Sequence, residues 1–336
     1  MNWEFVVEIT FDGWRRDDQI RRGHRMNKGT DKPGSEISPG KPAEEEFGVH
    51  LTHPDKVLFP ESGITKRDLA NYLRAASARM MPFVAGRLIS LVRCPDGIGA
   101  GSFFQRHPGR GMDPSWQHET VKTTQGSEEY LYLTDPNAIA AAAQMSAIEF
   151  HIWGSALKTL EQPDRIVFDL DPDEGLGFKK VKDAAFHMRE ALEALGLRSL
   201  ALLSGGKGVH VVVPIRPQQD WPIVKRFAAD LVGRMVEQKP DLYVGTMSKA
   251  KRHGRLFIDH FRNERGATAI APFSPRARAG APVAWPVTWD ALREIEAANV
   301  MTLPKALDAM AKADAWDGAD AAPQSLTKSM IAAATR

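Results

Sequence analysis

The most constraining stretch of the sequence is a short hydrophobic segment that carries two acids. Residues 165–172 read Arg-Ile-Val-Phe-Asp-Leu-Asp-Pro, and this β-branched and aromatic run predicts a buried strand. Because side chains alternate along a strand, Asp169 and Asp171 lie on the same face. Unpaired carboxylates in a core are costly, so the two acids sit at the exposed end of the strand, meet basic partners or bind a divalent cation.

A third acid follows a second apolar segment. Leu256, Phe257 and Ile258 lead directly into Asp259. Two acids at alternate positions of one strand and one from a neighbouring strand are the ligand set of a two-metal site for phosphoryl or nucleotidyl transfer, in which oxygen atoms hold hard cations. The same acids can instead cap strand ends or pair with nearby arginines, and the spacing alone leaves both interpretations standing.

A glycine-rich segment, residues 204–208, joins two predicted strands at 197–203 and 209–215. It reads Ser-Gly-Gly-Lys-Gly, so its backbone amides can converge on an anion, while Ser204, Lys207 and His210 add donors and charge. The segment lacks the spacing of a Walker phosphate-binding loop. The alternative is an ordinary glycine-rich hairpin, with His210 as a hydrogen-bonded core residue.

Basic and aromatic residues offer further contacts for a nucleotide. Phe103 and Phe104 fall on a predicted strand at 102–105, so one can face the core while the other offers a stacking surface for a base. A basic cluster surrounds the third acid, and although such a run is usually a solvated face, guanidinium groups also suit phosphate oxygens. The cluster consists of Lys249, Lys251, Arg252, Arg255, Arg262, Arg265, Arg276 and Arg278.

Composition limits the class of protein. The 336 residues are 43% hydrophobic and 26% charged, which is typical of a globular protein. The formal net charge is only +2, so a polyanion has to be bound by a local patch. A single cysteine, Cys94, fits a reducing compartment. The sequence has no apolar run that could span a bilayer and no secretory signal, so we expect a cytoplasmic protein without membrane association.

The pattern of elements predicts one main domain of the α/β or α+β class. We expect an N-terminal arm and linker at 1–46 with a strand at 5–11, a domain at 47–320 and a tail at 321–336. Helices are predicted at 65–83, after Asp135-Pro136, at 178–195 and from 220 to 238. Further strands are predicted at 88–92, 148–153 and 255–259, the last paired with 268–271.

Three motifs in order resemble one family. Phe-Asp-Leu-Asp-Pro at 168–172, Ser-Gly-Gly-Lys-Gly-Val-His at 204–210 and Phe-Ile-Asp at 257–259 are similar to motifs of the primase-polymerase domain of bacterial ligase D, in the archaeo-eukaryotic primase superfamily. The resemblance runs from about residue 49 to about residue 303. It implies a mixed, largely antiparallel sheet flanked by helices. It also implies a nucleotidyltransferase that adds nucleotides, preferably ribonucleotides, to a 3′-hydroxyl at DNA breaks or gaps during non-homologous end joining.

The resemblance also implies roles for individual residues. Two Mn²⁺ or Mg²⁺ ions would be bound by Asp169, Asp171 and Asp259. The nucleoside triphosphate would be bound by Phe103, Phe104, His151, Ser204, Lys207, His210, Arg252 and Arg276. The 5′-phosphate of a DNA end would be bound by Lys56 and Lys66. Two positions depart from the family pattern, with His53 where an asparagine is expected and Arg262 where a glutamine is common.

Partners and competing functions follow from the same comparison. The implied partners are DNA ends, ribo- or deoxynucleoside triphosphates, a Ku protein, and a ligase domain or separate ligase, on the bacterial nucleoid. Residues 6–14 resemble the closing strand of a ligase oligonucleotide-binding domain, but the sequence has no K-x-D-G adenylation motif. One alternative is a phosphatase of the haloacid-dehalogenase type, which uses D-x-D after an apolar strand of a parallel sheet. The other is a non-catalytic module that binds DNA ends.

Overall fold

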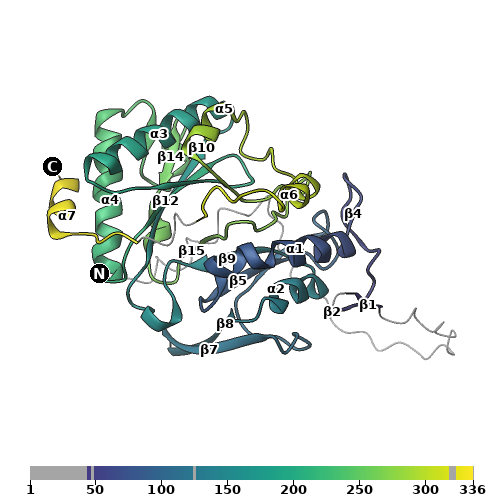
Figure 1. The fold of residues 1–336 in the computed structure, drawn as a ribbon. Helices are drawn as coiled ribbons and strands as arrows, with labels where there is room; N and C mark the ends of the chain where they lie inside the picture. The colour runs from purple at the N-terminus through teal and green to yellow at the C-terminus, as the bar shows by residue number, and fades with distance from the viewer. Residues whose placement is uncertain (1–43, 47–48, 124–125, 318–322, 336) are drawn as a thin grey trace, which may run out of the picture. The chain divides into compact units, whose positions relative to one another are not determined.

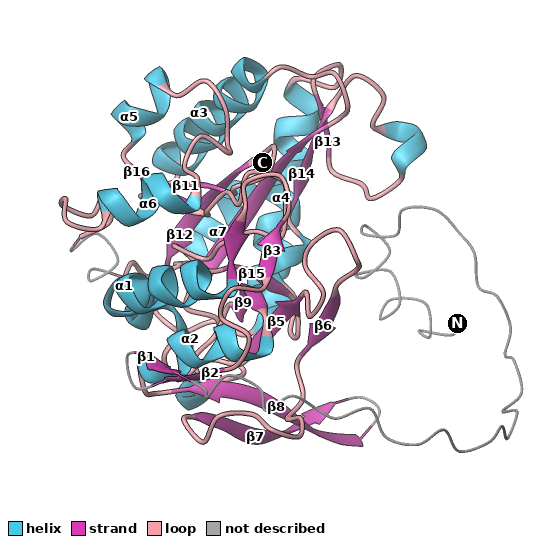
Figure 2. Cartoon of the chain, turned by 90° about the vertical axis from the view of Figure 1, so that its right-hand side faces the viewer, coloured by secondary structure: helices cyan, strands magenta, loops and turns pink. Residues whose placement is uncertain are grey.

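A computed structural model describes residues 44–46, 49–123, 126–317 and 323–335 (Figures 1 and 2). These residues belong to one compact unit that spans Glu44–Arg336. The predicted N-terminal strand at 5–11 and most of the predicted linker lie outside the described residues.

Two sheets organise the described part of the chain, and each has six strands there. The first sheet, called the acidic sheet below, has the order β13 (Tyr243–Val244), β14 (Leu256–Asp259), β10 (Arg165–Pro172), β12 (Val209–Pro214), β11 (Leu200–Leu203) and β16 (Trp285–Val287). The second has the order β15 (Thr268–Ile270), β9 (Ala147–Trp153), β5 (Ile89–Arg93), β8 (Gly126–Leu133) and β7 (Trp116–Thr123), with β6 (Phe103–Gln105) also paired to β5. Only the β13–β14 pair of these sheets is parallel within the described residues, which confirms the predicted mixed, largely antiparallel architecture.

The acidic sheet is covered on both faces. Alternate residues of β10, including Ile166, Phe168 and Leu170, pack in a core with the apolar faces of α3 (Phe178–Ala194) and α4 (Trp221–Gln238), and Figure 1 shows both helices beside β10, β12 and β14. Val167, on the other face, belongs to the core of the second sheet. The two acids of β10 share the face of Val167 because they follow it at intervals of two. They therefore lie on the side of the acidic sheet that faces the second sheet.

The long helices have the boundaries that their end signals predict. Thr65 caps α1 (Lys66–Val84) through a capping box with Asp68. Asp220 caps α4 and is followed by a proline in the first turn. Gly196, at φ +78°, lies just beyond the end of α3, in the left-handed conformation that glycine favours after a helix.

The shorter elements complete the unit. Two small two-stranded sheets pair β1 (Glu44–Glu46) with β2 (Val49–Leu51) and β3 (Val57–Phe59) with β4 (Ile64–Thr65). The remaining helices are α2 (Asn137–Ala141), α5 (Trp289–Glu294), α6 (Leu303–Ala309) and α7 (Lys328–Ala334), with 3₁₀ turns η2 (Ala142–Met145), η3 (Leu157–Thr159), η4 (Lys249–Lys251) and η5 (Phe261–Asn263). None of the described helices is long and apolar enough to cross a membrane.

Three local predictions differ from the structure. The strand at 268–270 pairs with β9 of the second sheet and not with β14, because pairing between distant segments depends on tertiary packing that the local pattern does not encode. The alanine-rich helix after Asp135 is a five-residue turn of α-helix that continues as 3₁₀. Pro136 stands at its N-cap, and the Asp135 side chain accepts a hydrogen bond from the Asn137 amide.

The end of the chain packs onto the main unit. Leu326 and Ala334 are buried in the same core as α4, and Figure 1 shows α7 next to α4. The proposed division of the chain at residues 46 and 320 stays a prediction, but the predicted tail holds a helix that covers apolar surface.

One buried amide ties β10 to the turn that follows β14. Asn263 is 1% exposed. Its side chain accepts a hydrogen bond from the Val167 amide at 2.7 Å and donates to the Val167 and His260 carbonyls at 2.8 and 2.9 Å. These bonds fix the position of Asp259 and its following turn relative to β10.

Replacing this side chain should therefore destabilise the fold. In Asn263→Ala, the amide and the carbonyl of Val167 lose their partner, while the His260 carbonyl keeps the backbone amide of residue 263, and we expect the free energy of unfolding to fall by about 2–4 kcal/mol. Denaturant unfolding followed by circular dichroism measures the change. Asn137→Ala, at an exposed position, is the matched control and should change stability by less than about 0.5 kcal/mol. A loss below about 1 kcal/mol in Asn263→Ala would contradict the structural role of this amide.

Candidate active site

The three acids of the motifs meet in the acidic sheet because of strand register. Asp169 on β10 lies directly opposite Asp259 on β14 and directly opposite His210 on β12. Directly opposed residues share a face of the sheet, so these three side chains form one row across three strands. Asp171 lies two positions further along β10, on the same face.

The side chains of Arg262 and His210 lie against the carboxylates of Asp169 and Asp259. Nε2 of His210 lies 3.4 Å from Oδ1 of Asp169. Nη2 of Arg262 lies 2.9 Å from Oδ2 of Asp259, and its Nε lies 3.9 Å from Oδ2 of Asp169. Burial on its own would raise the pKa of Asp169, but the His210 contact and the Arg262 charge lower it well below its ordinary value. In this structure Asp169 and Asp259 therefore lie against His210 and Arg262, as the salt-bridge interpretation of the acids expects.

Asp171 is less well compensated. Its carboxylate oxygen Oδ2 lies 3.7 Å from Nη1 of Arg252, and this guanidinium also lies 3.7 Å from the centroid of the Phe257 ring. Burial and then the negative charge of Asp169 raise the pKa of Asp171 to about 6, against the opposing effect of Arg252. Asp171, beside the row, is thus the least compensated of the three carboxylates.

The glycine-rich segment is a tight hairpin packed against the acidic strand. A Cβ on Gly208 would collide with the carbonyl of Leu170, so only glycine fits where the hairpin crosses β10. Lys207 is exposed at its tip. The amides of Gly206 and Gly208 donate to the hydroxyl of Ser204 at 3.2 and 3.3 Å. The expectation that these two amides point at an anion is therefore wrong, because the short turn closes on its own hydroxyl.

A buried carboxylate that the motifs do not include connects the two sheets. Glu149 of β9 is 2% exposed. Its carboxylate accepts a hydrogen bond from Nε2 of His151 at 2.7 Å and lies 3.2 Å from Nε of Arg276. Nη1 of Arg276 in turn donates to the Ser204 carbonyl at 2.5 Å. His151, Arg276 and the hairpin, which the sequence analysis named separately, are thus joined through a residue that it missed.

The aromatic pair lies beside this network. Phe103 and Phe104 are 47% and 39% exposed, so the prediction that one of them enters the core is wrong. Their strand, β6, pairs only with β5 among the described residues. The Phe104 ring lies 5.5 Å from the His151 ring, and the Arg93 guanidinium lies 5.2 Å from the Phe103 ring. Both rings offer surfaces on which a planar group can stack.

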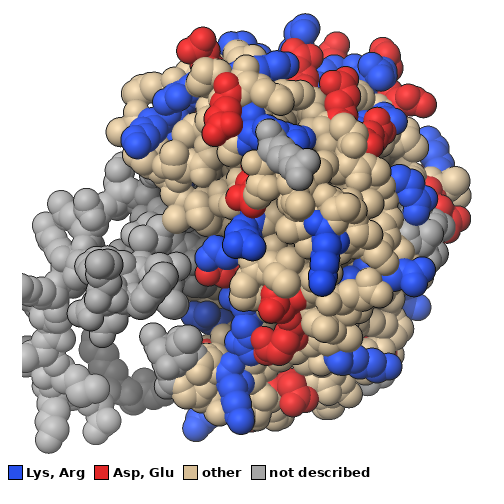
Figure 3. Space-filling view, turned by 90° about the vertical axis from the view of Figure 1, so that its left-hand side faces the viewer, with Lys and Arg blue, Asp and Glu red and all other residues tan. Residues whose placement is uncertain are grey.

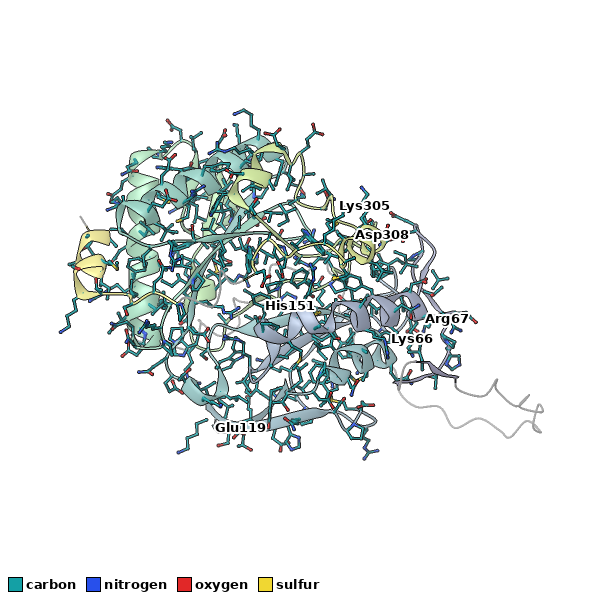
Figure 4. All side chains as sticks on the ribbon, viewed as in Figure 1. Lys66, Arg67, Glu119, His151, Lys305 and Asp308 are labelled. Atoms are coloured by element: carbon teal, nitrogen blue, oxygen red, sulfur yellow. The ribbon has the colours of Figure 1, made fainter. Side chains whose placement is uncertain are left out.

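The two lysines assigned to a 5′-phosphate form a separate basic group. Nζ of Lys66, the first residue of α1, donates to the Thr52 carbonyl and to the Gln144 side chain, both at 2.8 Å. Burial, and then the charges of Lys56 and Arg93, lower the pKa of Lys66 to about 8. Nζ of Lys56 pairs with Asp96 at 2.9 Å. Figure 4 shows Lys66 at the start of α1, away from His151.

Comparison with known proteins decides the family. The family model of the LigD primase-polymerase domain matches residues 65–316, which include the acidic strand, the hairpin and the third acid. The chain belongs to the LigD primase-polymerase domain family. This result confirms the resemblance inferred from the three motifs.

Curated LigD proteins are similar over most of this chain. The multifunctional non-homologous end joining protein LigD of Pseudomonas aeruginosa is 33% identical over 98% of this chain and 41% of its own length. The protein of the same description from Mycolicibacterium smegmatis is 34% identical over 74% of this chain and 33% of its own length. The bifunctional LigD of Bacillus subtilis is 26% identical over 79% of this chain and 43% of its own length. The chain therefore spans less than half the length of these relatives.

A solved structure shares the fold. The polymerase domain of Mycobacterium tuberculosis ligase D, solved in complex with DNA, matches with a TM-score of 0.76 and 29% sequence identity over 82% of this chain and 99% of that chain.

The haloacid-dehalogenase interpretation fails for an independent reason. Its D-x-D strand lies in a parallel sheet, whereas β10 is antiparallel to both of its neighbours.

The donor set suits the divalent cations that polymerase-type domains use. Asp169, Asp171 and Asp259 supply carboxylate oxygens, the ligands that hard cations prefer, and the raised pKa of Asp171 indicates negative charge that a cation would relieve. As the side chains stand, no three acidic, histidine or cysteine side chains of the described residues converge closely enough to hold a metal ion. The guanidinium of Arg262 lies against two of the three acids instead.

This competition generates a prediction for Arg262→Gln. Removing the guanidinium takes away a positive charge next to Asp169 and Asp259, so the affinity for Mn²⁺ without nucleotide should rise on the order of tenfold. Electron paramagnetic resonance of free Mn²⁺ measures it without catalysis. Arg265→Gln is the matched control, because Arg265 pairs with Glu161 on the surface at 2.7 Å. Equal Mn²⁺ affinity in Arg262→Gln and the control would show that Arg262 does not oppose cation binding.

Proposed function

We propose that this chain is a two-metal nucleotidyltransferase that adds nucleotides to the 3′-hydroxyl of DNA at breaks or gaps during non-homologous end joining. The observation that carries the proposal is the row of Asp259, Asp169 and His210 across three antiparallel strands, with the basic hairpin packed against it. Two bound Mn²⁺ or Mg²⁺ ions would supply activation of the hydroxyl and neutralisation of the pyrophosphate.

The residues around this row suit a nucleoside triphosphate. Lys207 at the exposed tip of the hairpin, and Arg252 beside Asp171, supply positive charge for phosphate oxygens. The exposed rings of Phe103 and Phe104 supply stacking surfaces for bases. On the face shown in Figure 3, basic and acidic side chains are interspersed, so this face has no field of a single sign that would attract DNA.

The second basic group suits the 5′-phosphate at the far side of a gap. The amides of Lys66 and Arg67 at the start of α1 already donate to the carbonyls of Lys56 and Pro54. A phosphate would therefore be bound by the ammonium groups of Lys56 and Lys66 and not by the end of the helix. Because the sequence has no K-x-D-G adenylation motif, we assign ligation to a ligase domain or a separate ligase, with a Ku protein as a further proposed partner. The proposed place of action is DNA on the nucleoid, in the cytoplasm.

Primer extension tests the reaction class directly. A primer annealed to leave a 5′-phosphorylated gap is incubated with Mn²⁺ or Mg²⁺ and with either ribo- or deoxynucleotides. We expect template-directed incorporation that requires the metal and favours ribonucleotides. Binding of gapped DNA without any incorporation would instead identify a non-catalytic module for DNA ends.

The Asp171 carboxylate should be essential for the reaction. Asp171→Asn keeps the shape of the side chain but removes its charge, so we expect extension to fall by at least about 100-fold while DNA binding changes little. Single-turnover extension and fluorescence anisotropy measure the two quantities. Asp308→Asn on α6 is the matched control, because Asp308 is exposed and lies away from His151 in Figure 4. Near-normal extension by Asp171→Asn would end the metal assignment.

The lysine group should confer preference for phosphorylated gaps. Lys56→Ala removes one charge from a half-exposed position, so we expect the preference for a 5′-phosphate over a 5′-hydroxyl to fall by about tenfold. Lys305→Ala, at an exposed position on α6, is the control. Because Lys66 loses its proton near pH 8, the wild-type preference should be full below that pH and decline above it. Equal loss on both kinds of end, or a preference that grows with pH, contradicts this role.

A further inference from the structure

Glu149 is buried among active-site groups, although it belongs to none of the three motifs. One carboxylate oxygen, Oε2, accepts the hydrogen bond from Nε2 of His151. The other, Oε1, accepts the amide of Ala277 at 2.9 Å and lies 3.2 Å from Nε of Arg276. Burial on its own would raise the pKa of Glu149, but the charge of Arg276 and the hydrogen bond from His151 lower it well below its ordinary value. The side chain is therefore a carboxylate whose two oxygens are both occupied.

This geometry determines the tautomer of His151. A carboxylate can only accept hydrogen bonds, so the hydrogen of a neutral imidazole ring must lie on Nε2. Burial lowers the pKa of His151, which keeps the ring neutral at neutral pH. The other ring nitrogen, Nδ1, then carries a lone pair and acts as an acceptor. An acceptor at this position suits a hydroxyl group of a ligand.

The surroundings of His151 indicate which hydroxyl this would be. The exposed Phe104 ring lies 5.5 Å from the His151 ring, so a base stacked on Phe104 would bring its attached sugar next to His151. On the other side of Glu149, Arg276 donates to the carbonyl of Ser204 in the hairpin. Glu149 thus contacts both His151, which would meet the sugar, and Arg276, which is bonded to the hairpin.

We propose that Glu149 is a positioning residue that holds His151 as the Nε2–H tautomer, so that Nδ1 accepts a hydrogen bond from a sugar hydroxyl of the incoming nucleotide, while the same carboxylate orients Arg276 against the hairpin. The proposal rests on the proposed function for the identity of the ligand. The assignment of the tautomer does not depend on catalysis.

The substitution Glu149→Gln replaces one of the two carboxylate oxygens with an amide nitrogen, which donates hydrogen bonds and does not accept them. The amide oxygen of a glutamine would accept the hydrogen bond from the Ala277 amide and face the positive charge of Arg276, and its amide nitrogen would then face His151. Because that nitrogen is a donor, Nε2 of His151 must become the acceptor and the hydrogen must move to Nδ1. The nearly isosteric change therefore reverses the polarity of the ring edge that meets the nucleotide.

The first test reads the tautomer itself. ¹⁵N chemical shifts of the His151 ring, assigned with the help of His151→Gln, should show a protonated Nε2 in the wild-type protein and a protonated Nδ1 in Glu149→Gln. A protonated Nδ1 in the wild type, or unchanged shifts in the variant, overturns the proposal. This measurement needs no nucleotide, so a wild-type chain that proves inactive overturns the polymerase function and leaves the tautomer assignment intact.

The second test reads the consequence for the substrate. In Glu149→Gln we expect kcat/KM for ribonucleotides to fall about tenfold, mainly through KM, with a smaller loss for deoxynucleotides that lack one hydroxyl. Glu119→Gln is the matched control, because Glu119 lies on β7, exposed and away from His151 in Figure 4. In a His151→Gln background, Glu149→Gln should no longer change the ratio of ribo- to deoxynucleotide use. An equal loss for both kinds of sugar in the wild-type background overturns the assigned role.

Discussion

The antiparallel pairing of β10 with β12 and β14 is the constraint on which the candidate site depends. It places Asp169 opposite both His210 and Asp259, and the apolar residues between the acids fill the core under α3 and α4. A shift of register by one residue would turn the polar side chains into that core and expose the apolar ones. The same hydrophobic alternation that stabilises the sheet therefore specifies the geometry of the acids.

Local sequence signals predicted the parts of the fold that depend on neighbouring residues. The boundaries of α1, α3 and α4 follow from Thr65, Gly196 and Asp220, because caps and apolar spacing act within a few residues. The acidic strand, the hairpin and the third acid were recognisable for the same reason, since each is a short motif. Their meeting in one row was expected from the chemistry and from the family resemblance, not from any local pattern.

Contacts that join distant segments leave no local pattern in the sequence. Asn263 bonds to the backbone of Val167 across 96 positions, and a lone asparagine in a basic stretch gives no sign of this. Glu149 belongs to none of the three motifs, but an acid two residues from a histidine on a predicted strand shares its face. That spacing was the available signal. The exposure of Phe103 and Phe104 depends on what packs against the two faces of β6, which only the tertiary structure determines.

The same acids that suit a divalent cation must also be tolerated without one. Burying a row of carboxylates is unfavourable unless other groups compensate them, and here the Arg262 guanidinium pairs with Asp259 while the His210 imidazole lies 3.4 Å from Asp169. The Asp171 side chain remains 53% exposed, against 21% for Asp169, and it retains the raised pKa. A divalent ion would therefore interact most favourably with Asp171, and less favourably with Asp169 and Asp259, whose negative charges already have partners. Arg262 and His210 stabilise Asp259 and Asp169 within the row, and the half-exposed Asp171 beside it keeps the negative charge that can attract a metal.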